Sequence, residues 1–146
     1  MEKEKRTLKF SEIFGFGAGG MFTYGFQLMI TGYYLLYYMT DIAGFSTVLA
    51  ASLYSAIQII KMVTMLFSGV IIDAINFRSG KYRTWVLVSG IGLGLFFPLS
   101  FFYYPLPQSV YVVVFMIIYT LQTLFYNVGW TAMRAMIGKV AKNKAD

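Results

Sequence analysis

The sequence predicts an all-α membrane protein with four transmembrane helices, and three observations support this fold class. Hydrophobic residues make up 58% of the chain and charged residues 12%, against about 25% charged in an average soluble domain. The apolar residues are gathered in four runs, each at or above the roughly 20 residues that a membrane-spanning helix needs. Most basic residues lie at the ends of these runs.

Each helix is expected where one apolar run lies. The runs are Phe14 to Tyr38, Thr47 to Ile72, Thr84 to Tyr104 and Val110 to Ile137. We therefore expect helices at about 14–39, 47–74, 84–104 and 110–138, which together form a transmembrane segment over 14–138. Residues 1–13 would form a cytoplasmic N-terminus and 139–146 a cytoplasmic tail.

The distribution of positive charge predicts the orientation in the membrane. Basic residues precede the first run, separate the second from the third, and follow the fourth: Lys3, Lys5, Arg6, Lys9, Arg78, Lys81, Arg83, Lys139, Lys142 and Lys144. The turns Thr40 to Ser46 and Pro105 to Ser109 carry none. The positive-inside rule then places both termini in the cytoplasm of a multi-pass inner-membrane protein. This topology, with contact to the lipid bilayer, accounts for the net charge of +6, so no nucleic-acid partner is expected.

The residue types argue against an enzyme, a metal site or a bound cofactor. The sequence has no histidine and no cysteine. Its acidic residues are scattered over Glu2, Glu4, Glu12, Asp41, Asp73 and Asp146. No pair of carboxylates can be placed on one helix face for acid–base catalysis or metal binding.

Several glycines fit a dinucleotide-binding fingerprint, but that motif needs a preceding strand. Gly15, Gly17 and Gly20 have the G-x-G-x-x-G spacing and open a membrane helix instead. Small residues let membrane helices approach closely. We therefore interpret the pairs Gly15/Gly19 and Gly90/Gly94 as packing faces.

Lys61 is the most informative residue of the sequence. It lies about ten residues from either end of its apolar run, roughly 15 Å along a helix, which is too far for its side chain to reach the membrane surface. An ionisable residue at such a depth is a functional-site hypothesis. The alternative is a structural pair with a residue elsewhere in the chain.

Polar residues recur at helical spacing on three of the four expected helices. Together with neighbouring aromatic residues, they give the candidate solute-lining set: Gln27, Thr31, Tyr34, Tyr54, Gln58, Lys61, Met65, Thr123, Asn127, Trp130, Thr131 and Arg134. Polar groups inside a membrane need partners or water, so a shared hydrated cavity is one interpretation. The other is ordinary hydrogen bonding between helices, worth about 0.6 kcal/mol per bond.

The connection between the second and third helices resembles a known signature. Gly69, Asp73, Arg78, Gly80, Lys81 and Arg83 resemble the cytoplasmic motif of the major facilitator superfamily, which implies a conformational latch between neighbouring helices. The YYxTDxxG string from Tyr37 to Gly44, the segment Gly80 to Trp85 and the opening Phe14 to Gly17 are similar to the glycoside-pentoside-hexuronide:cation symporters, the melibiose permease family.

This resemblance implies a secondary carrier that moves a sugar or related polar solute by alternating access. Such carriers have twelve helices in two halves. The chain would supply the first part of the N-terminal six-helix half, so we expect a truncated chain that needs the remaining helices of the full-length carrier as partners. A lysolipid carrier of the same superfamily, a non-transporting remnant and a regulatory membrane protein remain alternatives.

The chain departs from the family where the coupling cation binds. Members carry two aspartates on the second helix; here Lys61 and Met65 stand at those positions, and Asn127 stands where many relatives have aspartate. Sodium prefers oxygen ligands of this kind, so the usual sodium site is expected to be lost. Lys61 would then act as a tethered positive charge, pair with an anionic solute such as a hexuronide, or carry a coupling proton.

Overall fold

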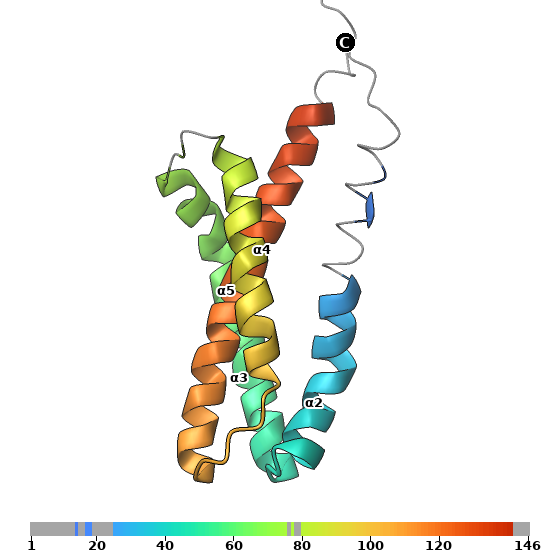
Figure 1. Cartoon of the computed structure of the whole chain (residues 1–146), viewed down its shortest axis with the longest axis vertical. Helices are drawn as coiled ribbons and strands as arrows, with labels where there is room; N and C mark the ends of the chain where they lie inside the picture. The colour runs from blue at the N-terminus through green and yellow to red at the C-terminus, as the bar shows by residue number, and fades with distance from the viewer. Residues whose placement is uncertain (1–13, 15–16, 19–24, 76, 78–79, 142–146) are drawn as a thin grey trace, which may run out of the picture.

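A computed structural model describes residues 14, 17–18, 25–75, 77 and 80–141 of the chain, and side chains up to Met136. In this part of the chain all regular structure is helical (Figure 1). Three helices are long and apolar enough to cross a membrane: Thr47–Ala74, Lys81–Ser100 and Gln108–Met136. The remaining expected span, 14–39, which is the first along the chain, lies partly outside the described residues.

The first described segment is a helix with two wide turns. Residues 25–29 are α-helical and lead into η1 (Ile30–Tyr34), α2 (Leu35–Tyr37) and η2 (Tyr38–Ile42). The η elements are π-helical turns, which in general occur singly and often at functional sites. The helix continues three residues beyond the expected end at 39. It is followed by a turn at Gly44, whose φ of 70° is a conformation that only glycine adopts without strain.

The helix α3 (Thr47–Ala74) occupies the same residues as the expected range. It begins at Ser46, whose hydroxyl oxygen accepts a hydrogen bond from the backbone N–H of Leu49 at 3.3 Å. This is the usual way in which a serine satisfies one of the free N–H groups at a helix start.

The helix α4 (Lys81–Ser100) begins three residues before the expected range 84–104 and ends four residues before its end. It begins at Gly80, which has a φ of 104°. It cannot continue through Tyr104 and Leu106 because each precedes a proline, which disfavours helical dihedral angles at the preceding residue. The helix α5 (Gln108–Ala141) starts directly after Pro107 and is longer than the expected 110–138 at both ends.

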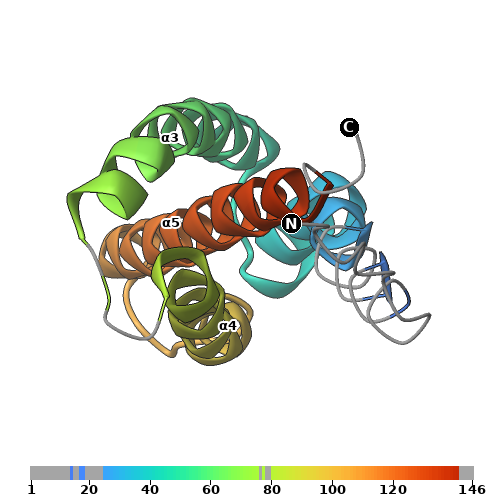
Figure 2. The ribbon, with the colours of Figure 1, turned by 90° about the horizontal axis from the view of Figure 1, so that it is seen from above.

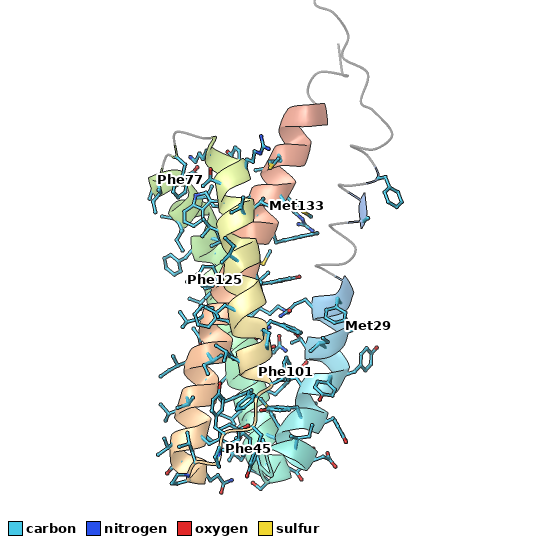
Figure 3. The ribbon with its side chains drawn as sticks, viewed as in Figure 1. Met29, Phe45, Phe77, Phe101, Phe125 and Met133 are labelled. Atoms are coloured by element: carbon cyan, nitrogen blue, oxygen red, sulfur yellow. The ribbon has the colours of Figure 1, made fainter. Side chains whose placement is uncertain are left out.

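The helix α5 lies between α3 and α4, as the view along the bundle shows (Figure 2). Two buried clusters hold these helices together. One contains Leu35, Met39, Phe45 and Phe115 at the end where η2 meets α3 (Figure 3). The other cluster lies at the opposite end of the bundle, where α3 ends and α4 begins. It joins these two helices to α5 through Ile72, Trp85, Val128 and Ala132.

Within the described residues, other glycines than the expected pair allow close packing. A Cβ atom built on Gly90 or Gly94 meets nothing within 4 Å among the described residues, so this pair does not pack against that part of the chain. A Cβ atom on Gly92 would lie 2.4 Å from the Phe125 ring, and one on Gly129 would lie 2.7 Å from Ser89 Cβ. The spacing of glycines cannot distinguish these faces, because it does not tell which side of α4 meets α5. The other expected pair, Gly15/Gly19, falls outside the described residues.

Candidate functional site

Lys61 lies on the middle of α3 and is partly buried. Its ammonium nitrogen is 5.9 Å from the centroid of the Tyr126 ring on α5, close enough for a cation–π attraction of about 0.5–2 kcal/mol. Within the described residues no carboxylate forms an ion pair with it. Asp73 instead pairs with Lys81, and Asp41 is hydrogen-bonded to Thr40 at the far end of the bundle. A structural pair for Lys61 thus takes the form of the contact with Tyr126 and not of an ion pair, within the part of the chain that the structure describes.

Asn127 on α5 binds the backbone of α3 at Lys61. Its side-chain nitrogen donates to the carbonyl oxygen of Lys61 at 3.0 Å and to the hydroxyl oxygen of Thr64 at 2.7 Å. One turn further along, the hydroxyls of Ser68 and Thr131 are 2.8 Å apart. These contacts fix α3 against α5 by polar bonds at the level of Lys61 and just beyond it.

The polar residues of the first helix are also used for packing. Gln27 and Thr31 are buried. The Thr31 hydroxyl oxygen accepts from Tyr119 at 3.2 Å, and the Gln27 carbonyl oxygen accepts from Gln122 at 3.4 Å. Gln122 is fully buried and is also bonded to Ser100 of α4 at 2.6 Å.

Sequence reasoning did not select Tyr119 and Gln122, although each joins α5 to the first helix. A signal was present for Gln122, because an amide inside an apolar run must find a hydrogen-bond partner. The set selected from the sequence contains Thr123, the next residue along the helix, but not Gln122.

The other predicted solute-lining residues fall into different environments. Thr123 is buried, and Tyr54 and Gln58 are partly buried on α3. Met65 is 54% exposed and Tyr34 is 41% exposed. The guanidinium carbon of Arg134 lies 4.5 Å from the centroid of the Trp130 ring, one turn away on the same helix.

The residues of the expected latch are only partly brought together. The ammonium of Lys81 is 2.6 Å from Asp73 Oδ1, which connects the end of α3 to the start of α4. Gly80 forms the turn between them, Arg83 is exposed, and Gly69 has open space around it among the described residues. Arg78 lies outside the described residues.

The YYxTDxxG string has a structural role at the other end of the bundle. The Tyr38 hydroxyl is 3.0 Å from the carbonyl oxygen of Phe102 and 2.6 Å from the hydroxyl of Tyr111. Because a carbonyl can only accept, Tyr38 donates to Phe102 and Tyr111 donates to Tyr38. Tyr38 thus fastens the start of the α4–α5 connection and α5 to the first helix.

The charged group at the middle of α3 is the ammonium of Lys61. Searched over the described residues, the histidine, cysteine and carboxylate side chains form no group of three that could hold a metal ion. An ammonium that is not neutralised by a carboxylate attracts anions and repels cations.

Comparison with known proteins agrees with the resemblance seen in the sequence. The family model described as MFS/sugar transport protein matches residues 15–146. The chain is 29% identical over 126 residues to "Putative glycoside/cation symporter YagG" of Escherichia coli (strain K12), an alignment that covers 84% of this chain and 27% of that protein. It is 28% identical over 94 residues to "Glucuronide carrier protein homolog" of the same strain, covering 64% of this chain and 20% of that protein.

A further relative is "Uncharacterized symporter YnaJ" of Bacillus subtilis (strain 168), 35% identical over 54 residues, with 37% of this chain and 12% of that protein covered. No solved structure matches the chain at a significant level. The matched part thus amounts to about a quarter of the first relative and a fifth of the second. The chain belongs to the MFS/sugar transport protein family, and it fits the glycoside-pentoside-hexuronide:cation symporters of the major facilitator superfamily.

Proposed function

We propose that this chain forms the first part of a secondary carrier that moves a sugar or a related polar solute by alternating access. The family supports a transporter, and the names of the relatives include a glycoside/cation symporter and a glucuronide carrier homolog. Because the chain matches only 27% of the first relative, the complete solute pathway would include further helices. The candidate lining residues on α3 and α5 would contribute one wall of it.

The observation that carries the mechanistic part of this proposal is the position of Lys61. Its ammonium stands at mid-span, next to the Tyr126 ring and without a carboxylate partner among the residues described. Two unit positive charges about 4 Å apart repel by roughly 4 kcal/mol at an effective dielectric constant near 20. A sodium ion at this place would meet that repulsion, so we propose that the carrier does not couple sodium at the usual site.

Asn127 supports the same conclusion. A sodium ion needs oxygen atoms directed toward it, whereas the side-chain nitrogen of Asn127 is directed at the two oxygens of α3 that it binds. Its N–H groups fill the space between these oxygens. No cation is needed to hold α3 and α5 together here.

We further propose that the α3–α4 connection faces the cytoplasm and carries the conformational latch. Lys81 and Arg83 lie at this end, where Lys81 pairs with Asp73. The C-terminal end of α5 is at the same end (Figure 1). By the positive-inside rule this places the end with Gly44 and the α4–α5 connection outside the cytoplasm of an inner-membrane protein.

Uptake by the complete carrier in proteoliposomes tests the proposed function. We expect uptake of a labelled glycoside or glycuronide that is the same with sodium as with choline in the outer solution. The double variant Lys61→Asp with Met65→Asp places two carboxylates one turn apart on α3, and its uptake should become stimulated by sodium. The matched control is Lys61→Asp with Met62→Asp, because Met62 is 68% exposed and lies on another face.

Two results would contradict the proposal. Uptake by the unchanged carrier that requires sodium would show that the coupling site survives. Absence of uptake for every sugar would favour a non-transporting membrane protein. The 146-residue chain alone in liposomes is the negative control, since one wall of a pathway is not expected to transport.

A further inference from the structure

The first helix is held to the middle of α5 by two hydrogen bonds that are longer than usual. The hydroxyl of Tyr119 donates to Thr31 at 3.2 Å. The amide of Gln122 donates to Gln27 at 3.4 Å. Such bonds are most often about 2.8 Å between two oxygens and about 2.9–3.0 Å from nitrogen to oxygen. Near the C-terminal end of the helix, the Tyr38 hydroxyl is 3.0 and 2.6 Å from its two partners. The helix is therefore held more firmly at Tyr38 than at Thr31 and Gln27.

Packing divides the first helix in the same way. Leu35, Tyr38 and Met39 are almost completely buried and belong to the cluster where η2 meets α3. Leu28 and Met29, which lie between the two residues bonded to α5, are 59% and 68% exposed within the described residues. Moving the N-terminal part away from α5 therefore breaks few contacts, whereas moving the C-terminal part would open a packed core.

A wide helical turn joins these two parts. In η1 the backbone N–H of Leu35 bonds to the carbonyl oxygen of Ile30, five residues back, instead of four residues back as in an α-helix. Sharp bends in helices occur at such π-helical turns, and hinges are formed by a few residues that absorb a change in dihedral angles. The turn contains Thr31 and ends directly before Leu35. It lies where the weaker contacts give way to the buried ones, which is the place for a hinge.

The amide of Gln122 can keep hydrogen-bond partners when Gln27 moves away. The Ser100 hydroxyl oxygen is 2.6 Å from Gln122 Oε1 and 2.8 Å from the carbonyl oxygen of Phe96. A hydroxyl has one proton, so Ser100 donates to one of these oxygens at a time. Without Gln27, the amide of Gln122 can turn and donate to Ser100, which then donates to Phe96. Opening therefore does not leave this fully buried amide without a partner, which would cost more than the lost bond itself.

We infer that residues 25–34 form a hinged gate over α5, which turns about η1 and is kept closed by the two hydrogen bonds from Tyr119 and Gln122. Tyr119, Gln122 and Tyr126 are spaced at i, i+3 and i+7 and therefore lie on one face of α5. Opening would uncover this face as far as the ring that the Lys61 ammonium contacts. The movement takes place among the helices of this chain, and its use as a gate for the solute rests on the proposed function.

The rate at which a buried cysteine reacts with a water-soluble maleimide measures how often the segment over it opens. The complete carrier, without other cysteines, is given Thr123→Cys as the reporter on α5, because Thr123 is 3% exposed and directly follows Gln122. Ala50→Cys reports on the buried cluster at the other end of the first helix. We expect Gln27→Leu with Thr31→Val to raise the alkylation rate of the first reporter about sevenfold, equivalent to about 1.2 kcal/mol at 1.4 kcal/mol per factor of ten. The second reporter should stay unreactive.

The matched control for the two substitutions is Thr120→Val. Thr120 is the neighbour of Tyr119, but its hydroxyl donates to Met116 of its own helix, so the alkylation rate of Thr123→Cys should equal that in the otherwise unchanged carrier. An equal rate in the double variant and in this control would overturn the gate. A parallel rise at Ala50→Cys would also overturn it, because the whole helix would then have left the bundle instead of turning about η1.

A second measurement tests whether transport needs the opening. The complete carrier with Gln27→Cys and Gln122→Cys is linked by a short bis-methanethiosulfonate reagent, and its uptake of a labelled glycoside should be lost and then regained on reduction. The two single-cysteine variants, treated in the same way, should keep their uptake. Continued uptake by the linked carrier would overturn the gate while the carrier function stands. Absence of uptake in every form would defeat the proposed function, and the alkylation rates would still decide whether the segment turns about η1.

Discussion

The side-chain nitrogen of Asn127 lies 3.0 Å from the main-chain carbonyl oxygen of Lys61, so the residue that stands at mid-membrane on α3 is fixed through its backbone by α5. A carbonyl oxygen can only accept a hydrogen bond, so the contact requires a donor, which the NH₂ group of Asn127 supplies. An ionised aspartate at this position would direct an oxygen at another oxygen. This relationship explains in chemical terms why asparagine suits this helix pair.

Replacement of Asn127 should destabilise the α3–α5 pair in a way that depends on the substituent. Asn127→Leu loses two interhelical bonds, for about 1 kcal/mol at the average of 0.6 kcal/mol each. Asn127→Asp should cost more, about 1–3 kcal/mol, because the Lys61 carbonyl then faces an acceptor. Unfolding in mixed detergent micelles measures both. The control is Thr120→Val, whose hydroxyl bonds to Met116 of its own helix; equal stability of Asn127→Asp and the unchanged chain would contradict the assignment.

The two tyrosines at the opposite end should show unequal effects. Tyr38→Phe removes both the donation to Phe102 and the acceptor for Tyr111, whereas Tyr111→Phe removes only the second bond. At about 0.5–1.5 kcal/mol per bond, we expect losses of about 2 and about 1 kcal/mol in the free energy of unfolding. The double variant should be no less stable than Tyr38→Phe alone. Tyr37→Phe, at a residue that is 53% exposed, should change little, and additive losses in the double variant would refute the shared network.

Neighbouring glycines of α4 should respond in opposite directions to alanine. Gly92→Ala introduces a Cβ atom 2.4 Å from the Phe125 ring and should destabilise the fold by about 1–3 kcal/mol, as overpacking does. Gly90→Ala points into open space among the described residues and should be neutral or stabilise the helix by up to about 1 kcal/mol. Thermal unfolding of the two variants in the same detergent gives the comparison; a loss of stability in Gly90→Ala would show that its face is packed.

The proposed orientation can be tested with single cysteines, because the sequence contains none. Leu106 lies in the α4–α5 connection and Ile75 directly follows α3, and these two segments are at opposite ends of the bundle (Figure 1). The two residues are matched at 42% and 44% exposure. A membrane-impermeant maleimide added to intact cells should label Leu106→Cys and leave Ile75→Cys unlabelled until the cells are opened. The reverse pattern would overturn the assignment of the cytoplasmic side.

Much of the fold is encoded in the order of residues along the chain. The apolar run that starts at Thr47 predicted the bounds of α3, and the structure adds that Ser46 caps the start of this helix. The bounds of α4 were less accurate. Its start at Lys81 depends on the φ of Gly80, and its end on the prolines after Tyr104 and Leu106, which an apolar window passes over.

The sequence alone determined that this is a helical membrane protein of a sugar-transport family with a lysine inside an apolar run, since composition, charge position and local motifs are properties of the chain itself. The tertiary structure decided which polar residues are used up in helix packing. Helical periodicity groups Gln27, Asn127 and Lys61 alike, but Gln27 and Asn127 meet partners on another helix while the ammonium of Lys61 meets only a ring within the described residues. Partners distant in sequence come together only when helices pack, and that contact separates the polar groups that join helices from those that have no polar partner within the described residues.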